Sequence, residues 1–230
     1  MSKEAKELET VIGYRFHDAA LLAQAMIHSS YINEHKMNPL ENNERLEFLG
    51  DAVLELVISR CIFSRYPELS EGELTKLRAA VVCEAMLSKK ARTLGLGDCL
   101  RMSKGELQTG GYERESTLCD AFEALLGALY LDGGFEVAER FALAQLEADI
   151  AEMRSAIWQS DCKTHLQEQL QKASREPIEY AVIGEQGPDH DKVFIVELRH
   201  GGQVIGTGEG HSKKEAEQNA AACAIRALGL

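Results

Sequence analysis

The stretch from Leu118 to Leu131 is apolar on nearly every side of a helix, yet it contains two carboxylates, Asp120 and Glu123. A helix with this pattern is expected to be buried. Burying an ionised group without a partner is costly. The sequence therefore predicts a buried helix whose two charges are offset by another group.

A second acidic cluster lies on another helical stretch. Glu44, Glu47 and Asp51 stand at i, i+3 and i+7, which places three carboxylates on one helical face. Such a stripe is usually the solvated face of an amphipathic helix, and spacing alone favours that interpretation. Spacing also leaves open whether the two helices converge.

A divalent cation would explain both clusters if they met. Five carboxylates in one place would repel one another, and each basic residue neutralises only one of them. Mg²⁺ prefers a few carboxylates together with waters and substrate phosphates. The clusters therefore indicate metal-assisted phosphoryl chemistry.

The composition is that of a globular protein, with 45% hydrophobic and 27% charged residues in a chain of 230. No apolar run approaches the roughly 18–20 residues that span a bilayer, and the N-terminus has no apolar signal-peptide core. We therefore expect a cytoplasmic protein with no membrane partner. The six cysteines have no C-x-x-C spacing and are expected to be reduced and mostly buried.

The first part of the chain, up to about residue 155, is predicted to be helical. Ser70 and Glu73 match a capping box at the start of one helix, and His28 is expected to be a capping or core histidine. The apolar periodicity is clearest at 43–64, 72–94, 116–131 and 135–154.

The second part has a different pattern, with a domain boundary near 155–160. Its pattern predicts a helix, then three β-strands joined by turns, and finally an Ala-rich helix. These segments are 162–174, 179–183, 193–198, 203–208 and 212–228.

Overall charge does not indicate a nucleic-acid partner. From Asp161 onward 8 Lys/Arg stand against 11 Asp/Glu, a net charge of −3, which leaves −9 of the total −12 for the first part. Lys213 and Lys214 lie in the first turn of the last helix, where cations oppose the macrodipole. They are either an anion-binding helix end or ordinary surface lysines, and the sequence favours neither.

Several segments resemble bacterial ribonuclease III. Residues 43–51, NERLEFLGD, are similar to the signature helix of that family, and residues 120–124, DAFEA, to its second acidic segment. Residues 70–78 and 105–111 match the family in order and spacing. The α-β-β-β-α part resembles a double-stranded-RNA-binding domain, so the resemblance covers nearly the whole chain.

The resemblance implies a fold and an activity. The fold is an all-α ribonuclease III catalytic domain at 1–155, a linker at 156–160 and a small α+β double-stranded-RNA-binding domain at 161–230. The activity is divalent-metal-dependent hydrolysis of double-stranded RNA that leaves 5′-phosphate and 3′-hydroxyl ends with short 3′ overhangs. Mg²⁺ is the implied cofactor, with Mn²⁺ able to substitute. Ribosomal and messenger RNA processing is the implied role.

The resemblance also implies roles for individual residues that match positions of the family's site. Asp51 and Glu123 match catalytic positions, and Glu44 and Glu71 match supporting acidic positions. The family is homodimeric, and Phe48 matches a residue that packs across the subunit junction, although plain core packing fits its periodicity equally well. The positions that match metal ligands are Glu47, Asp51, Asp120 and Glu123.

The resemblance also implies contacts to RNA. Lys104 and Arg114 flank a glycine-rich loop of the first domain and are expected to touch the RNA backbone near the cleavage point. Glu217 departs from the pattern, because many such domains have a basic residue there, and this would remove one phosphate contact. The matching residues of the small domain are Thr164, Gln167, Glu168, His190, Ser212, Lys213 and Lys214.

Two other functions are compatible with parts of this pattern. A non-catalytic scaffold that binds double-stranded RNA would be free to lose acidic positions, whereas all six are present. A helical metalloprotein with another substrate leaves the α-β-β-β-α part unexplained.

Overall fold

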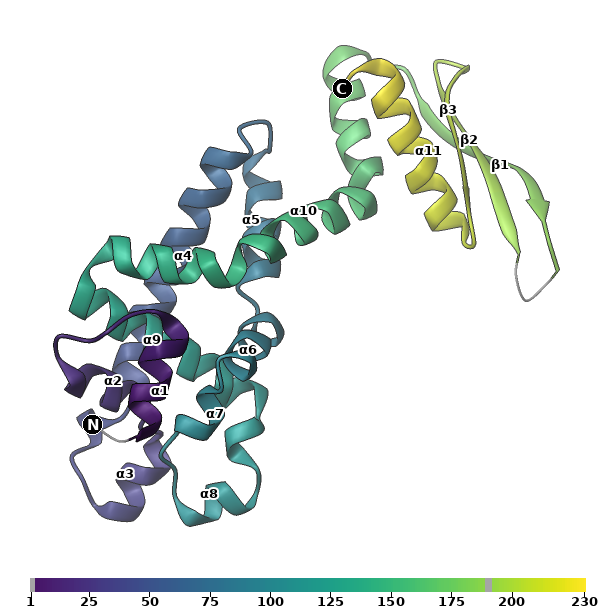
Figure 1. The fold of residues 1–230 in the computed structure, drawn as a ribbon. Coiled ribbons are helices and arrows are strands. Elements are labelled where there is room, and N and C mark those ends of the chain that lie inside the picture. Colours follow the sequence, from purple (N-terminus) through teal and green to yellow (C-terminus); the bar gives the residue numbers. More distant parts are fainter. Residues whose placement is uncertain (1–2, 189–191) are drawn as a thin grey trace. The chain divides into compact units, whose positions relative to one another are not determined.

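The structure is a computed structural model that describes residues 3–188 and 192–230. The chain forms two compact units, Met1–Met153 and Arg154–Leu230. Helices make up the first unit, and a three-stranded sheet with helices makes up the second (Figure 1). The predicted fold class, an all-α part followed by an α-β-β-β-α part, is confirmed.

The first unit contains short helices around two long ones (Figure 1). Single 3₁₀ turns, η1 (Pro39–Glu41) and η2 (Gly111–Glu113), lie between helices. The α-helices are α1 (Lys3–Ile12), α2 (Ala19–Ala25), α3 (Ser29–His35), α4 (Glu44–Arg65), α5 (Glu71–Val81), α6 (Glu84–Thr93), α7 (Leu96–Cys99), α8 (Lys104–Gln108), α9 (Glu115–Gly133) and the start of α10 (Phe135–Ala173).

The core of this unit forms around α9, as the apolar stretch predicts. This helix contacts α2, α4, α6 and α7. Phe122, Leu125, Leu126 and Leu129 are fully buried. Burying side chains of this size contributes roughly 1.5–3 kcal/mol each.

One predicted helical segment differs from the structure. The stretch 72–94 is two helices, because Cys83 adopts an extended conformation, with φ −71° and ψ 152°. No Gly or Pro marks that break. The residues predicted as a linker, 156–160, are part of α10 and contain neither Gly nor Pro.

The capping box at the start of α5 is confirmed. Ser70 accepts a hydrogen bond from the backbone of Glu73, whose carboxylate accepts one from the backbone of Ser70 at 2.8 Å. None of the six cysteines, all of which the structure describes, is in a disulfide, but the expectation that most are buried is wrong. Cys119 and Cys162 are buried, whereas Cys83 is exposed at the α5–α6 break, which helical periodicity does not reveal.

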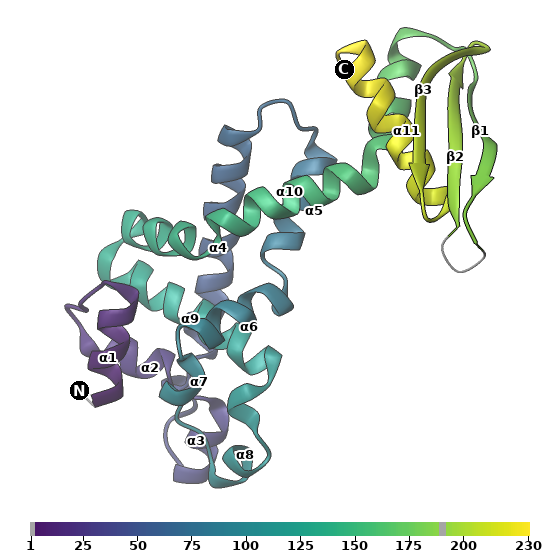
Figure 2. The same ribbon diagram turned by 45° about the vertical axis from the view of Figure 1, so that its right-hand side comes forward.

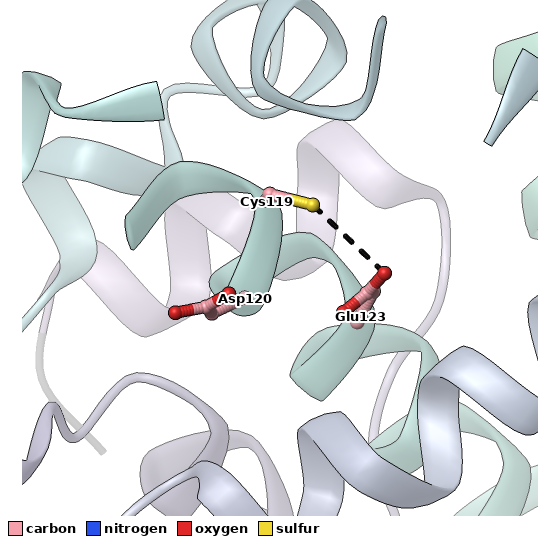
Figure 3. A group of neighbouring side chains, drawn as sticks. All are labelled: Cys119, Asp120 and Glu123. Atoms are coloured by element: carbon pink, nitrogen blue, oxygen red, sulfur yellow. Dashed lines mark hydrogen bonds between the residues drawn. The ribbon is translucent and has the colours of Figure 1, made fainter. Parts of the chain in front are cut away.

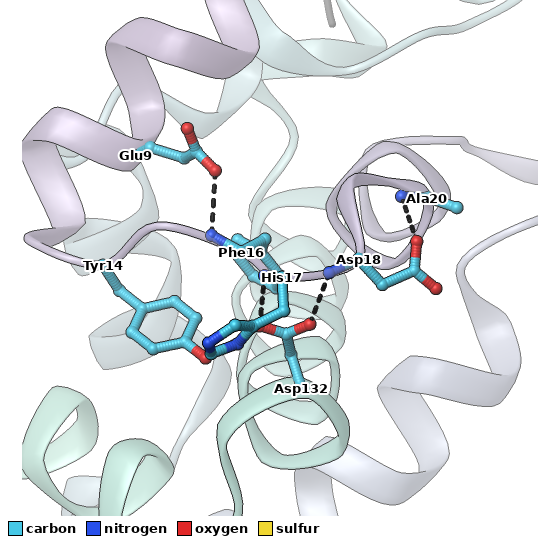
Figure 4. A network of polar contacts seen from close by, with 7 residues as sticks. All are labelled: Glu9, Tyr14, Phe16, His17, Asp18, Ala20 and Asp132. Atoms are coloured by element: carbon cyan, nitrogen blue, oxygen red, sulfur yellow. Dashed lines mark hydrogen bonds and ion pairs between the residues drawn. The ribbon is translucent and has the colours of Figure 1, made fainter.

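Asp132, near the end of α9, forms hydrogen bonds to residues 14–18, the segment that precedes α2 (Figure 4). Its carboxylate accepts hydrogen bonds from the Tyr14 hydroxyl at 2.7 Å and from the backbone N–H groups of His17 and Asp18 at 2.9 and 2.8 Å. Burial opposes ionisation of Asp132, but these hydrogen bonds outweigh it and lower the pKa to about 2. The segment before α2 is thereby fixed to the central helix.

In the second unit the strands β1 (Ile178–Gln186), β2 (Val193–His200) and β3 (Gln203–Gly210) form an antiparallel sheet in the order β1-β2-β3. The end of α10 and α11 (Lys213–Leu228) pack on one face of this sheet (Figure 2). Alternate residues of β3 are glycines, and a Cβ on Gly208 would lie 2.1 Å from the backbone nitrogen of Ala220. Because glycines face alanines, α11 lies close against the strand.

No helix in the described part of the chain combines the length and the apolar character that a membrane crossing requires.

Candidate active site and RNA-binding residues

Two glycines let α4 and α9 cross in close contact. A Cβ on Gly50 would lie 1.8 Å from the carbonyl oxygen of Glu123, and one on Gly127 would lie 2.2 Å from the carbonyl oxygen of Leu46. Each glycine therefore faces the backbone of the other helix. The crossing lies beside the acidic residues, because Gly50 precedes Asp51 and Gly127 is one turn after Glu123.

The carboxylates of the two helices act on one another. Burial raises the pKa of Glu47 to about 7, and repulsion from neighbouring carboxylates adds to the effect. Those neighbours are Asp120 of α9, followed by Glu44 and Asp51 of α4. Glu44 and Asp51 are exposed, as expected of a solvated helix face, whereas Glu47 is half-buried and is repelled by Asp120 of α9.

Glu123 is in a similar environment. Burial raises its pKa to about 7, followed by repulsion from Asp51, Glu47 and Asp120. The pKa of Asp120 is also raised, first by burial. The four side chains that were predicted as metal ligands therefore lie near enough to repel one another. Of these four, the structure places the ligand atoms of Asp120 and Glu123 within 4.8 Å of each other, together with that of Cys119, and Glu47 and Asp51 are not in that group.

This environment suits a divalent cation. Among the described residues, the groups that shift the pKa values of Glu47 and Glu123 are carboxylates and one thiol. Oxygen donors of this kind are the ligands that Mg²⁺ prefers. A cation would relieve the repulsion that otherwise favours protonation of two carboxyls near neutral pH.

Cys119 is a site residue that the sequence analysis missed. Its Sγ donates a hydrogen bond to Oε1 of Glu123 at 3.8 Å (Figure 3). The ligand atoms of Cys119, Asp120 and Glu123 all lie within 4.8 Å of one another. A cysteine in an apolar helix resembles core, and its only signal is its position four residues before Glu123.

Two residues from other helices or their ends, Glu84 and His28, act electrostatically on Asp120 and Cys119. Glu84, in the first turn of α6, raises the pKa values of Asp120 and Cys119. His28 lowers the pKa of Asp120. As expected, His28 is also a capping residue, since it accepts a hydrogen bond from the backbone of Ser30 at the start of α3. Neither contact has a local signal in the sequence.

Glu71 and Phe48 lie away from the core. Glu71, in the first turn of α5, accepts a hydrogen bond from Oγ1 of Thr75 at 3.0 Å and lines a groove between α4 and α5. Phe48 is 80% exposed, so core packing is excluded for it. Leu56 and Phe63, also on α4, are 56% and 72% exposed. These three side chains give α4 an exposed apolar surface.

The predicted RNA contacts of the first unit are exposed. Lys104 begins α8. Arg114 lies at the start of α9, and its guanidinium is 2.7 Å from Oε1 of Glu106. Glu106 therefore fixes the position of Arg114.

The predicted RNA contacts of the second unit lie on two helices. Thr164, Gln167 and Glu168 are exposed near the end of α10. Lys213 and Lys214 are exposed in the first turn of α11, where Ser212 accepts a hydrogen bond from the backbone of Glu215. His190 lies outside the described residues.

Glu217 has a structural partner. Its Oε2 lies 2.5 Å from Nζ of Lys163, which is also 4.2 Å from the ring centre of Tyr180. In addition, the side chain of Gln218 accepts a hydrogen bond from the backbone of Lys163. Glu217 thus contributes to attaching α11 to α10.

Comparison with known proteins assigns both units. Residues 18–150 match the family model described as Ribonuclease-III-like, and residues 162–228 match the double-stranded RNA binding motif. The nuclease domain of ribonuclease III from Campylobacter jejuni aligns with a TM-score of 0.59 and 44% identity, covering 64% of this chain and 97% of that domain.

Full-length relatives agree with this assignment. A protein named Ribonuclease 3 from Desulforamulus reducens is 51% identical over 226 residues, which is 98% of this chain and 92% of the relative. Another of that name, from Geobacillus thermodenitrificans, is 48% identical over 97% of this chain and 90% of its own length. The chain therefore belongs to the ribonuclease III family, as an endoribonuclease that acts on double-stranded RNA.

Proposed function

We propose that this endoribonuclease depends on a divalent metal ion and leaves 5′-phosphate and 3′-hydroxyl ends with short 3′ overhangs. The observation that carries the proposal is the meeting of carboxylates from α4 and α9 at a crossing where glycines bring the two backbones together. Mg²⁺ is the proposed ion, and Mn²⁺ is proposed to substitute because it accepts similar oxygen ligands.

Glu47, Asp51, Asp120 and Glu123 are the proposed ligands, and Glu44 supports them through its effect on Glu47. When bound, the ion supplies a water of lowered pKa and neutralises charge that develops on phosphate oxygens. We assign the catalytic role to Asp51 and Glu123.

We propose that the second unit binds the RNA duplex. The minor groove of A-form RNA is wide and shallow and displays 2′-hydroxyls, so exposed polar side chains suit it. Thr164, Gln167 and Glu168 form such a group near the end of α10. Lys213 and Lys214, with Ser212 at the helix start, are placed to contact phosphates.

We also propose a homodimer. The exposed apolar surface of α4, with Phe48 at 80% exposure, is what a subunit junction would cover. A second Campylobacter jejuni nuclease-domain structure, with 45% identity and a TM-score of 0.58, is described as containing a region involved in dimer formation. That alignment covers 62% of this chain and 96% of the domain. Glu71 lies in the groove beside this surface and is proposed to support the site in the dimer.

The cellular role that we propose is the processing of ribosomal RNA precursors and of messenger RNAs in the cytoplasm. The name Ribonuclease 3, which both relatives have, supports the RNA-cleaving part of this role.

Glu123→Gln tests the metal-dependent activity. The substitution keeps the shape of the side chain and removes its charge, so we expect cleavage of a labelled RNA duplex in Mg²⁺ to fall at least about 100-fold, with duplex binding largely retained. Glu115→Gln, on the exposed start of the same helix, is the matched control and should cleave at the normal rate.

The outcomes separate the proposal from its rival. Unchanged turnover of Glu123→Gln would refute the assignment of this residue. If the unmodified protein bound RNA but did not cleave it in Mg²⁺ or Mn²⁺, the chain would instead be a non-catalytic scaffold. End-group analysis of the products tests the proposed 5′-phosphates and 3′-hydroxyls.

A further inference from the structure

The carboxylate cluster contains a donor that the proposed Mg²⁺ chemistry does not use. Cys119 is 9% exposed, and its thiol faces Glu123 (Figure 3). A thiol is a soft donor, so a hard cation such as Mg²⁺ gains no ligand from it.

A soft or borderline cation interacts differently with the same residues. Zn²⁺ and Cd²⁺ bind thiolate strongly and also accept carboxylate oxygen. In the described part of the chain, Cys119, Asp120 and Glu123 form the one group of three such donors found within ligand distance. The other five cysteines are not in a group of this kind.

The spacing of the donors fits a single ion. Metal–sulfur bonds are about 2.3 Å long and metal–oxygen bonds about 2.0–2.2 Å, so two donors on one ion are at most about 4.5 Å apart. Sγ of Cys119 and Oε1 of Glu123 are already 3.8 Å apart, and all three ligand atoms lie within 4.8 Å. A small rotation of one side chain brings the set into range.

We propose that Cys119, Asp120 and Glu123 form a mixed sulfur–oxygen site that binds thiophilic divalent cations such as Zn²⁺ and Cd²⁺ and excludes Mg²⁺ from the active site. On binding, the Sγ–H bond breaks, an Sγ–metal bond forms and the proton passes to the buffer, with no change of oxidation state. Occupancy of this site inhibits cleavage. The binding is independent of the proposed function, whereas the inhibition rests on it.

Cadmium titration of the full-length protein tests the binding. A thiolate bound to Cd²⁺ gives an ultraviolet charge-transfer band, which we expect to saturate at one Cd²⁺ per chain. Cys119→Ser and Cys119→Ala should lose this band. Cys83→Ser, which removes an exposed thiol outside the cluster, is the control and should retain it.

The proposal fails if the band is unchanged in both Cys119 variants. A thermal melt of each variant establishes that it is folded. Glu123→Gln provides a test that leaves Cys119 in place, and its affinity for Cd²⁺ should fall about 10–100-fold. An unaltered affinity would also overturn the three-ligand site.

A cleavage assay in constant Mg²⁺ tests the inhibition. The Cd²⁺ concentration that halves the rate should be at least about tenfold higher for Cys119→Ser than for the unmodified protein, each relative to its own rate without Cd²⁺. Equal sensitivity would overturn the proposed exclusion of Mg²⁺. Absence of any Mg²⁺-dependent cleavage by the unmodified protein would refute the proposed function and leave the cadmium band as the test of the site.

Discussion

Glu47 and Glu123 are two residues whose charge couples folding to pH and to metal. Their pKa values are raised from 4.5 to about 7 in the folded protein, so the folded chain holds protons that the unfolded chain has released. The resulting stabilisation is fully present below pH 4.5 and is lost as the pH rises through about 7.

This sign gives a prediction for the metal-free protein. We expect its melting temperature to fall as the pH rises through about 7, and Mg²⁺ to raise it more above that value than below it, because the ion competes with protons for the same carboxylates. Calorimetry with and without chelator measures both effects. If Mg²⁺ raised the melting temperature equally above and below pH 7, the prediction would be contradicted.

At this scale the sequence predicted the acidic residues but not their surroundings. Two carboxylates in an apolar helix indicate that a partner is required, which is why Asp120 and Glu123 were identifiable. Cys119, Glu84 and His28 were not, because a thiol in an apolar helix resembles core and the other two come from separate elements. Contacts between elements have no local pattern.

At the scale of helices, the close crossing of α4 and α9 depends on Gly50 and Gly127, which have no side chain to keep the backbones apart. We expect Gly50→Ala to lower the free energy of unfolding by about 1–3 kcal/mol, because its Cβ would overlap the carbonyl oxygen of Glu123. Cleavage in Mg²⁺ should fall as well, since the two sets of ligands would move apart. Urea denaturation and a cleavage assay provide the measurements.

Gly72→Ala is the matched control for this change. A Cβ at Gly72 meets nothing within 4 Å, and alanine favours the helix, so stability should be unchanged or increased by up to about 1 kcal/mol. A Gly50→Ala protein as stable as the unmodified one would show that the helices separate without cost.

Most helices and strands were predictable, and the errors have local causes. Periodicity identified α4, α5 and α9, and a capping box also marks the start of α5. The break between α5 and α6 was not predicted, because no Gly or Pro marks it. Gly50 and Gly127 showed no role until their opposite helices were known.

At the scale of the whole molecule, the order of helices and strands predicted two units, a helical one and an α-β-β-β-α one. The chain has a net charge of −12, so attraction to RNA must come from local groups rather than from overall charge. Lys213 and Lys214 are exposed candidates for this role. Glu217 is paired with Lys163, which offsets the charge of that lysine.

We expect Lys213→Ala combined with Lys214→Ala to weaken binding to all RNA duplexes alike. The slope of log affinity against log salt concentration should decrease in magnitude by about 2, one for each lost phosphate contact. Arg226→Ala, which removes an exposed charge from the opposite end of α11, should leave the slope unchanged. Equal slopes for the double variant and the unmodified protein would exclude these lysines as phosphate contacts.

The hydrogen bonds of Asp132 limit how far the nuclease part can be shortened. The region that matches the family model begins at residue 18, which is after Tyr14 and His17. A fragment that starts at residue 18 would keep every proposed metal ligand. However, the Asp132 side chain, which is 2% exposed, would lose the hydrogen bonds from the Tyr14 hydroxyl and the His17 backbone N–H. The smallest active fragment should therefore start before Tyr14.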